Sequence, residues 1–92
     1  MFGKQDKKDL ARFVIYKLND AKATDDWGIM SRLDFERLAK GAKLFKNDND
    51  TLEPALSLLT NYIRWATEKP RWTIEVLPEA ARAYEQVALW MS

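Results

Sequence analysis

The chain has 92 residues, of which 47% are hydrophobic and 12% aromatic, and its 15 basic and 14 acidic residues give a net charge of +1. Such a chain can bury a core, which excludes a disordered, charge-dominated polypeptide. It has no cysteine and no histidine, and so lacks disulfides, thiolates, the commonest metal ligand and the commonest general base. We therefore expect one domain over residues 1–92, with no cofactor, no metal and no enzymatic activity.

The amino-terminal segment has no apolar h-region, and no apolar run approaches the ~20 residues of a membrane-spanning helix. We expect a soluble, cytoplasmic protein that does not associate with membranes. Because the net charge is near zero, attraction to nucleic acid would have to come from a local surface. The largest local surplus lies in residues 1–23, which carry six basic and three acidic groups.

A first helix is expected from about Asp6 to just before Thr24. Lys17 falls inside its apolar arc, and we expect its stem to cover apolar surface while its ammonium reaches water, in preference to a buried ion pair. Ile15 falls beside the basic side and is predicted to lie outside the core face. Apolar residues at helical spacing predict that face, namely Leu10, Phe13, Val14, Leu18 and Ala21.

Residues 24–30 are expected to form a loop or a single turn, with Gly28 at a positive φ and Trp27 closing one end of the helical core. Ser31 and Asp34 have capping spacing, which predicts a second helix reaching about Lys46. Its inward residues are predicted to be Phe35, Leu38, Ala39, Ala42 and Phe45.

Gly41 lies in the interior of this second helix, where glycine costs roughly 1 kcal/mol relative to alanine. We therefore expect another backbone to approach it closely. Arg37, Lys40 and Lys43 recur every third residue and partly surround Leu44 on the outward side of the same helix.

The broadest apolar arc lies in residues 51–69, which we predict to form the central helix. It is expected to begin between Asp50 and Pro54 and to be ended by Pro70. So broad an arc must contact more than one neighbouring helix. Its members are Leu52, Ala55, Leu56, Leu58, Leu59, Tyr62, Ile63, Trp65 and Ala66.

Residues 71–77 alternate like a strand, and three interpretations remain open: an extended connector, which we favour, a strand that pairs with a second copy, or a helical turn starting at Thr73. Pro78 suits the first turn of a final helix, which leaves Leu89 on its polar side. The inward residues of this helix are predicted to be Ala80, Ala83, Tyr84, Val87, Ala88 and Met91.

Together these segments predict an all-α protein, either a small four-helix bundle or a compact orthogonal packing of four helices, with an extended or irregular connector near residues 71–77. No phosphate-binding loop, metal-ligand spacing or catalytic triad order is present. Apolar and basic residues outside the predicted core favour a non-catalytic protein–protein interaction module, such as an accessory subunit, adaptor or inhibitor, with homodimerisation as an option. The candidate partner-binding residues are Ile15, Arg37, Lys40, Lys43, Leu44 and Trp72.

The alternative is a nucleic-acid-binding protein. The turn before the central helix resembles that of a helix-turn-helix, and this helix would present Ser57, Thr60, Asn61 and Arg64 to bases or phosphates. Acidic residues at its leading end would repel phosphates, so this alternative ranks second. A basic surface is a further possibility for either kind of partner, formed by Lys8, Arg12, Arg37, Lys40 and Lys43.

Overall fold

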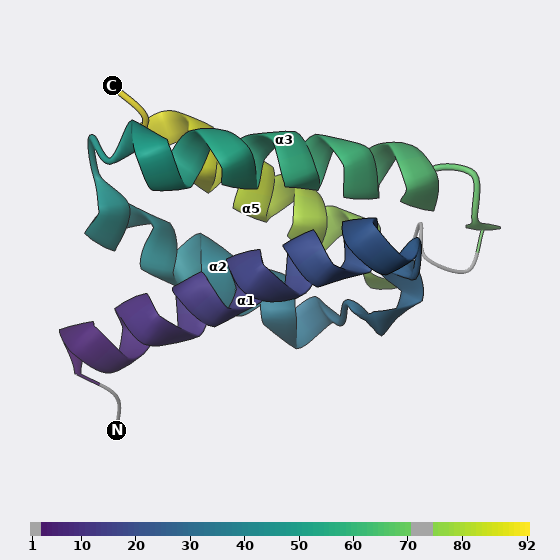
Figure 1. The fold of residues 1–92 in the computed structure, drawn as a ribbon, viewed down its shortest axis with the longest axis horizontal. Helices are drawn as coiled ribbons and strands as arrows, with labels where there is room; N and C mark the ends of the chain where they lie inside the picture. Colours follow the sequence, from purple (N-terminus) through teal and green to yellow (C-terminus); the bar gives the residue numbers. More distant parts are fainter. Residues whose placement is uncertain (1–2, 71–74) are drawn as a thin grey trace.

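The computed structural model describes residues 3–70 and 75–92, and its four labelled helices and two short 3₁₀ turns confirm the all-α class (Figure 1). No strand occurs in these two ranges. The predicted connector near residues 71–77 falls largely on residues 71–74, Trp72 included, which lie outside the described residues. The elements are α1 (Lys4–Thr24), η1 (Trp27–Ile29), α2 (Arg32–Gly41), η2 (Ala42–Phe45), α3 (Asn49–Ala66) and α5 (Leu77–Trp90).

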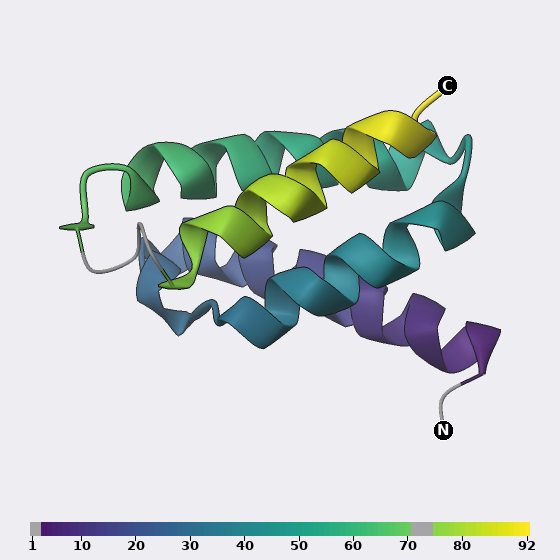
Figure 2. The ribbon, with the colours of Figure 1, turned by 180° about the vertical axis from the view of Figure 1, so that it is seen from behind.

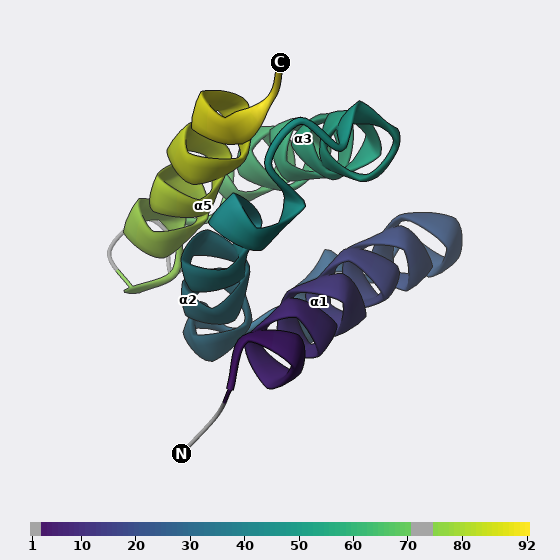
Figure 3. The ribbon, with the colours of Figure 1, turned by 90° about the vertical axis from the view of Figure 1, so that its left-hand side faces the viewer.

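The four helices form a bundle in which each packs against two others (Figure 3). Helix α5 lies between α3 and α2, and α1 contacts both α2 and α3 (Figure 2). The prediction that α3 touches more than one neighbour is therefore confirmed. Helices α2 and α3 occupy opposite corners, so their main packing partners are α1 and α5 and not each other.

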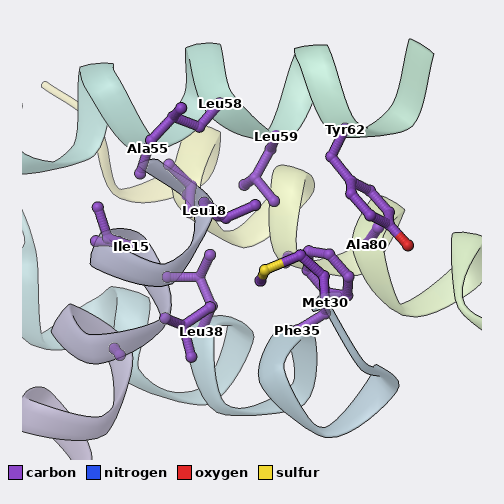
Figure 4. Close-up of a cluster of buried hydrophobic side chains, with 14 of the residues drawn as sticks. Ile15, Leu18, Met30, Phe35, Leu38, Ala55, Leu58, Leu59, Tyr62 and Ala80 are labelled. Carbon is purple, nitrogen blue, oxygen red and sulfur yellow. The ribbon is translucent and has the colours of Figure 1, made fainter. Parts of the chain in front are cut away.

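The core forms where apolar faces of all four helices meet (Figure 4). Leu18 of α1, Leu38 of α2, Leu59 of α3 and Ala80 of α5 point into the same cluster and are fully buried. Tyr62 is equally buried, and its ring centroid lies 4.7 Å from that of Phe35 and 6.1 Å from that of Trp27. The broad arc of α3 and the burial of Trp27 were thus predicted correctly.

The predicted core face of α1 was wrong by a rotation of roughly 60°, counting 100° per residue. Phe13 is 59% exposed and Leu10 is only half-buried, whereas Ile15, predicted to lie outside the core, is 8% exposed and belongs to it. Two small residues complete the buried face, which consists of Ala11, Val14, Ile15, Leu18 and Ala21.

The close approach of α1 and α2 at Gly41 explains this rotation. A Cβ atom on Gly41 would lie 2.6 Å from the Cβ of Ala11 and 2.9 Å from the backbone oxygen of Lys7. The predicted close backbone approach is therefore confirmed. Because the small Ala11 must face α2 at this point, Phe13 is turned towards solvent.

Helix boundaries differ from the predictions, and α3 ends at Ala66 instead of continuing to Pro70. Helix α2 ends at Gly41 and continues as the 3₁₀ turn η2, instead of remaining α-helical to Lys46. Helix α3 begins at Asn49 because the side chain of Asp48 accepts a hydrogen bond from the Thr51 amide at 3.3 Å, so Pro54 lies beyond the first turn. No glycine takes a positive φ among the described residues; Asp25 does so, with φ 52°, and ends α1.

Helix α5 follows its predicted face only in part. Ala80, Ala83 and Val87 are buried, while Tyr84 and Ala88 are exposed, contrary to prediction. Leu89 lies on the solvent side as expected. The end of α5 is tied to the start of α3, because the Ser92 amide donates to Asn49 Oδ1 at 3.1 Å and the Asn47 amide donates to the Trp90 oxygen at 3.0 Å.

Replacing Gly41 by alanine is expected to lower the free energy of unfolding by about 1 to 3 kcal/mol, although alanine is the better helix former. The added methyl group would overlap both Ala11 and the backbone of Lys7, so the two helices must separate. Chemical denaturation of Gly41→Ala measures the loss. Adding Ala11→Gly should restore only part of it, because the contact with the Lys7 backbone remains.

Gly28→Ala provides the matched control, since a Cβ at that position would meet only Asp26 Oδ1, at 3.8 Å. This variant should be neutral or gain up to about 1 kcal/mol. Equal destabilisation by both substitutions would show that the α1–α2 contact is not the cause.

Burial raises the pKa of Tyr62 to about 12. In the unfolded chain a tyrosine loses its proton near pH 10, so the folded state binds the extra proton between those two values. The folded-state pKa is raised, and the free energy of unfolding should therefore fall as pH rises from 10 to 12, by about 2 to 3 kcal/mol from this side chain. Tyr62→Phe should show a shallower decline in alkaline denaturation, and identical slopes would contradict the burial of this hydroxyl.

Candidate functional site

A groove with a volume of about 410 Å³ lies between α1 and α2. Leu33, Arg37 and Lys40 are four and three residues apart and so form one stripe along α2. Lys7 and Leu10, three residues apart, form the opposite side from α1. The two leucines supply apolar surface, and cations stand on both sides of it. We call these five residues the α1–α2 groove.

Within the described part of the chain, the charges of the α1–α2 groove have no ion-pair partners. Lys7, Arg37 and Lys40 form no ion pair with any acidic residue in the described ranges, although Glu36 precedes Lys40 by one helical turn. By contrast, Arg12 binds Asp9 at 3.0 Å. The groove therefore presents three free positive charges around apolar surface.

Exposed apolar side chains continue from the groove across the solvent face of α1. Leu10, Phe13 and Tyr16 are spaced by three residues, so neighbouring members adjoin on the helix surface. Phe13 is 59% and Tyr16 62% exposed, and Leu33 in the groove is 50% exposed. Single exposed apolar residues are common, whereas adjoining ones make this face of α1 a candidate contact surface.

An ion pair also joins α1 to α2. Lys17 Nζ donates a hydrogen bond to Asp34 Oδ2 at 2.8 Å, and both the amide and the hydroxyl of Ser31 donate to the same oxygen, at 2.9 and 3.0 Å. The Asp34 amide in turn donates to Ser31 Oγ, which confirms the predicted capping box. The expectation that Lys17 extends unpaired into water was wrong, because Asp34 lies within its reach.

Burial by itself would raise the pKa of Asp34. Hydrogen bonds from Lys17 and Ser31, together with the positive charge of Lys17, outweigh that effect and hold the pKa below its ordinary value. The ionised carboxylate thus both starts α2 and fixes it to α1.

The predicted partner-binding residues are only partly brought together. Arg37 and Lys40 line the groove, whereas Lys43 and the half-buried Leu44 lie in η2 and do not line it. Ile15 is buried, and the reason is the rotation of α1 described above. Trp72 lies outside the described residues.

Sequence reasoning placed Leu10 and Phe13 on the core face of the first helix and did not single out Lys7 or Leu33. The spacing of Leu33, Arg37 and Lys40 was a usable signal, because it places a leucine and two cations on one helix face. The contributions from α1 had no such signal, since they depend on how α1 is rotated against α2.

The predicted basic surface is divided between separate places. Lys8 Nζ and the Arg12 guanidinium carbon lie 5.2 and 5.4 Å from the centre of the Phe45 ring, where cation–π attraction holds them. Arg37 and Lys40 lie in the groove with Lys7. Lys43 lies in η2, outside the groove, so the cations predicted to form one surface do not share one environment.

The predicted nucleic-acid-binding residues are spread over three surface hollows along α3. Ser57 shares one with Asp50 and Glu53. Asn61 lines another, which also contains Asp25 and Glu68, and Arg64 lies between that hollow and a third. The Thr60 hydroxyl donates to the Leu56 oxygen at 2.9 Å within α3. Carboxylates thus share the hollows of Ser57 and Asn61, two of the side chains proposed to approach phosphates.

Within residues 3–70 and 75–92, no group of three acidic residues is placed to hold a metal ion. None of the helices in these ranges is long and apolar enough to span a bilayer.

Comparison with protein-family models gave no match, and neither curated proteins nor solved structures matched the chain significantly. Function must therefore be inferred from the residues and their arrangement.

Asp34→Asn is expected to lower the free energy of unfolding at pH 7 by about 1 to 3 kcal/mol, because it leaves Lys17 without its charged partner. Since the folded-state pKa of Asp34 is lowered, its contribution is present at neutral pH and is lost as pH falls below about 4. The free energies of unfolding of the wild type and of Asp34→Asn, measured by denaturation, should therefore become equal at acid pH.

The exposed pair of Asp9 and Arg12 supplies the control for this measurement. Asp9→Asn should change the free energy of unfolding by less than ~1 kcal/mol. A gap between wild type and Asp34→Asn that persists unchanged at pH 2 would exclude the carboxylate charge as its source.

Proposed function

We propose that this chain is a small, non-catalytic protein-interaction module that binds a partner protein through α1 and α2. One observation carries the proposal: three cations without ion-pair partners in the described ranges surround the exposed Leu33 and the half-buried Leu10 in the α1–α2 groove. Leaving both charge and apolar surface unpaired contributes nothing evident to the fold. Complementary groups on another molecule would satisfy both.

A protein partner fits this surface better than a nucleic acid. The phosphate backbone is recognised by cations and hydrogen-bond donors, so Leu10 and Leu33 would contribute little to binding it. The net charge of +1 also gives weak attraction to a polyanion. Apolar side chains of a protein would use the leucines, and its acidic side chains would use the cations.

A different protein is also favoured over a second copy of this chain. In a two-fold symmetric dimer the same patch faces itself, so Lys7, Arg37 and Lys40 would meet like charges. If α1 of one copy instead packed antiparallel against α1 of the other, with Phe13 and Tyr16 at the centre of the contact, Asp9 would lie close to Asp20 of the second copy. Like charges placed opposite each other disfavour both arrangements.

Site-specific photocrosslinking tests this function. A photoreactive amino acid replaces Leu33 in the groove or, as a control, Leu89 on α5, which is 63% exposed. In lysate of the source cells, the position-33 probe should yield discrete protein adducts that the position-89 probe does not. These adducts should survive nuclease, weaken with Lys40→Gln and persist with Lys43→Gln.

Several results would contradict the proposal. Equal adducts at positions 33 and 89 would indicate non-specific contact, and adducts that disappear with nuclease would promote the nucleic-acid alternative. Adducts formed only with this chain itself would indicate homodimerisation.

A further inference from the structure

We infer that the occupant of the α1–α2 groove is an acidic amphipathic helix of the partner, which inserts apolar side chains between Leu10 and Leu33 and pairs its carboxylates with Lys7, Arg37 and Lys40. This inference rests on the proposed function and specifies the chemistry of the partner.

The shape of the groove favours a helix. It runs between two packed helices, and its volume of about 410 Å³ suits a few side chains better than a broad protein surface. Helices that bind such grooves insert anchors spaced by three, four and seven residues. The α2 side has this same spacing in Leu33, Arg37 and Lys40, which allows successive turns of two adjacent helices to meet.

The charges of the groove favour acidic flanks on that helix. Lys7 stands on the α1 side and Arg37 and Lys40 on the α2 side, so carboxylates on both edges of an apolar stripe would find a cation. The guanidinium of Arg37 can also bind a carboxylate through two parallel hydrogen bonds.

Three neighbouring carboxylates of the chain itself are engaged by other groups, and the fourth, Glu36, forms no ion pair with the groove cations. Asp6 accepts a hydrogen bond from the Gly3 amide at the start of α1, and Asp9 binds Arg12. Asp34 binds Lys17 and Ser31. These groups therefore leave the groove cations available to an incoming acidic helix.

The groove is poorly suited to binding a nucleic acid. Among the described residues, no aromatic side chain lines the groove, so none of them offers unpaired bases a stacking platform there. Phe13, adjacent to Leu10 on α1, instead extends the apolar surface along the path that a bound helix would follow.

Three synthetic 15-residue peptides test the inference by titration into the full-length, ¹⁵N-labelled chain. The first places leucines on one helical face and glutamates beside them. The second has the same composition with the leucines distributed around the helix, and the third replaces each glutamate by lysine. Only the first should give saturable amide shifts centred on Leu10, Leu33, Arg37 and Lys40.

Variants then assign the affinity to the groove. Leu33→Ser should weaken binding of the first peptide by about tenfold, and Lys40→Gln by about three- to fivefold. Leu89→Ser and Lys43→Gln, which make the same changes outside the groove, should alter it by less than about twofold. All four positions lie at the surface, and thermal denaturation verifies that each variant folds.

Equal binding of the first two peptides would overturn the inference, because charge alone would then suffice. Shifts centred elsewhere, binding of the lysine peptide, no binding at all, or displacement of the first peptide by a short RNA or DNA duplex would also overturn it. If the peptide fails while protein adducts at position 33 persist, only the helical, acidic occupant is excluded. If those adducts are absent as well, the proposed function fails with it.

Discussion

The contact between Gly41 and Ala11 is the constraint on which the rest of the structure depends. Because Gly41 has no side chain and Ala11 only a methyl group, the backbones of α1 and α2 approach to a distance that no larger pair would allow. This approach sets the rotation of α1, which buries Ile15 and exposes Phe13. The same rotation leaves Leu10 at the edge of the contact, where it lines the groove opposite Leu33. The contact between Gly41 and Ala11 thus determines both which residues of α1 enter the core and which line the groove.

The buried carboxylate of Asp34 adds a directional constraint to this contact. Apolar packing alone would permit α2 to slide along α1, but an ionised group in a buried position needs its hydrogen-bond partners. Ser31 supplies them from the start of α2 and Lys17 from α1. The register of the two helices is thereby coupled to where α2 begins, and with it the position of Leu33 relative to Leu10.

Local signals were predictable from the sequence, and so was a close approach of another backbone at Gly41, but the rotation of α1 against α2 was not. The capping hydrogen bonds join Ser31 and Asp34, which are only three positions apart. The apolar arc of α3 is so broad that a small error in the predicted orientation of this helix would not change which residues face the core. On α1 the prediction failed because Phe13 is more hydrophobic than Ala11, so the pattern favoured the larger residue. Only the contact with Gly41 of α2 turns Ala11 inward and Phe13 outward, and the sequence of α1 alone contains no sign of that contact. The groove was missed for the same reason, since it requires the rotation of α1 as well as the stripe on α2.

A net charge near zero therefore does not imply an electrically neutral surface. The fold engages several carboxylates locally: Asp6 and Asp48 at helix starts, and Asp34 at the α1–α2 contact. Lys7, Arg37 and Lys40 have no such engagement in the described ranges, and they converge on one groove. Charges within a few ångströms interact more strongly than distant, screened ones, so a partner at this groove meets its local positive field and not the molecular sum. Which charges the fold leaves unpaired is thus more informative about binding than how many charges the chain carries.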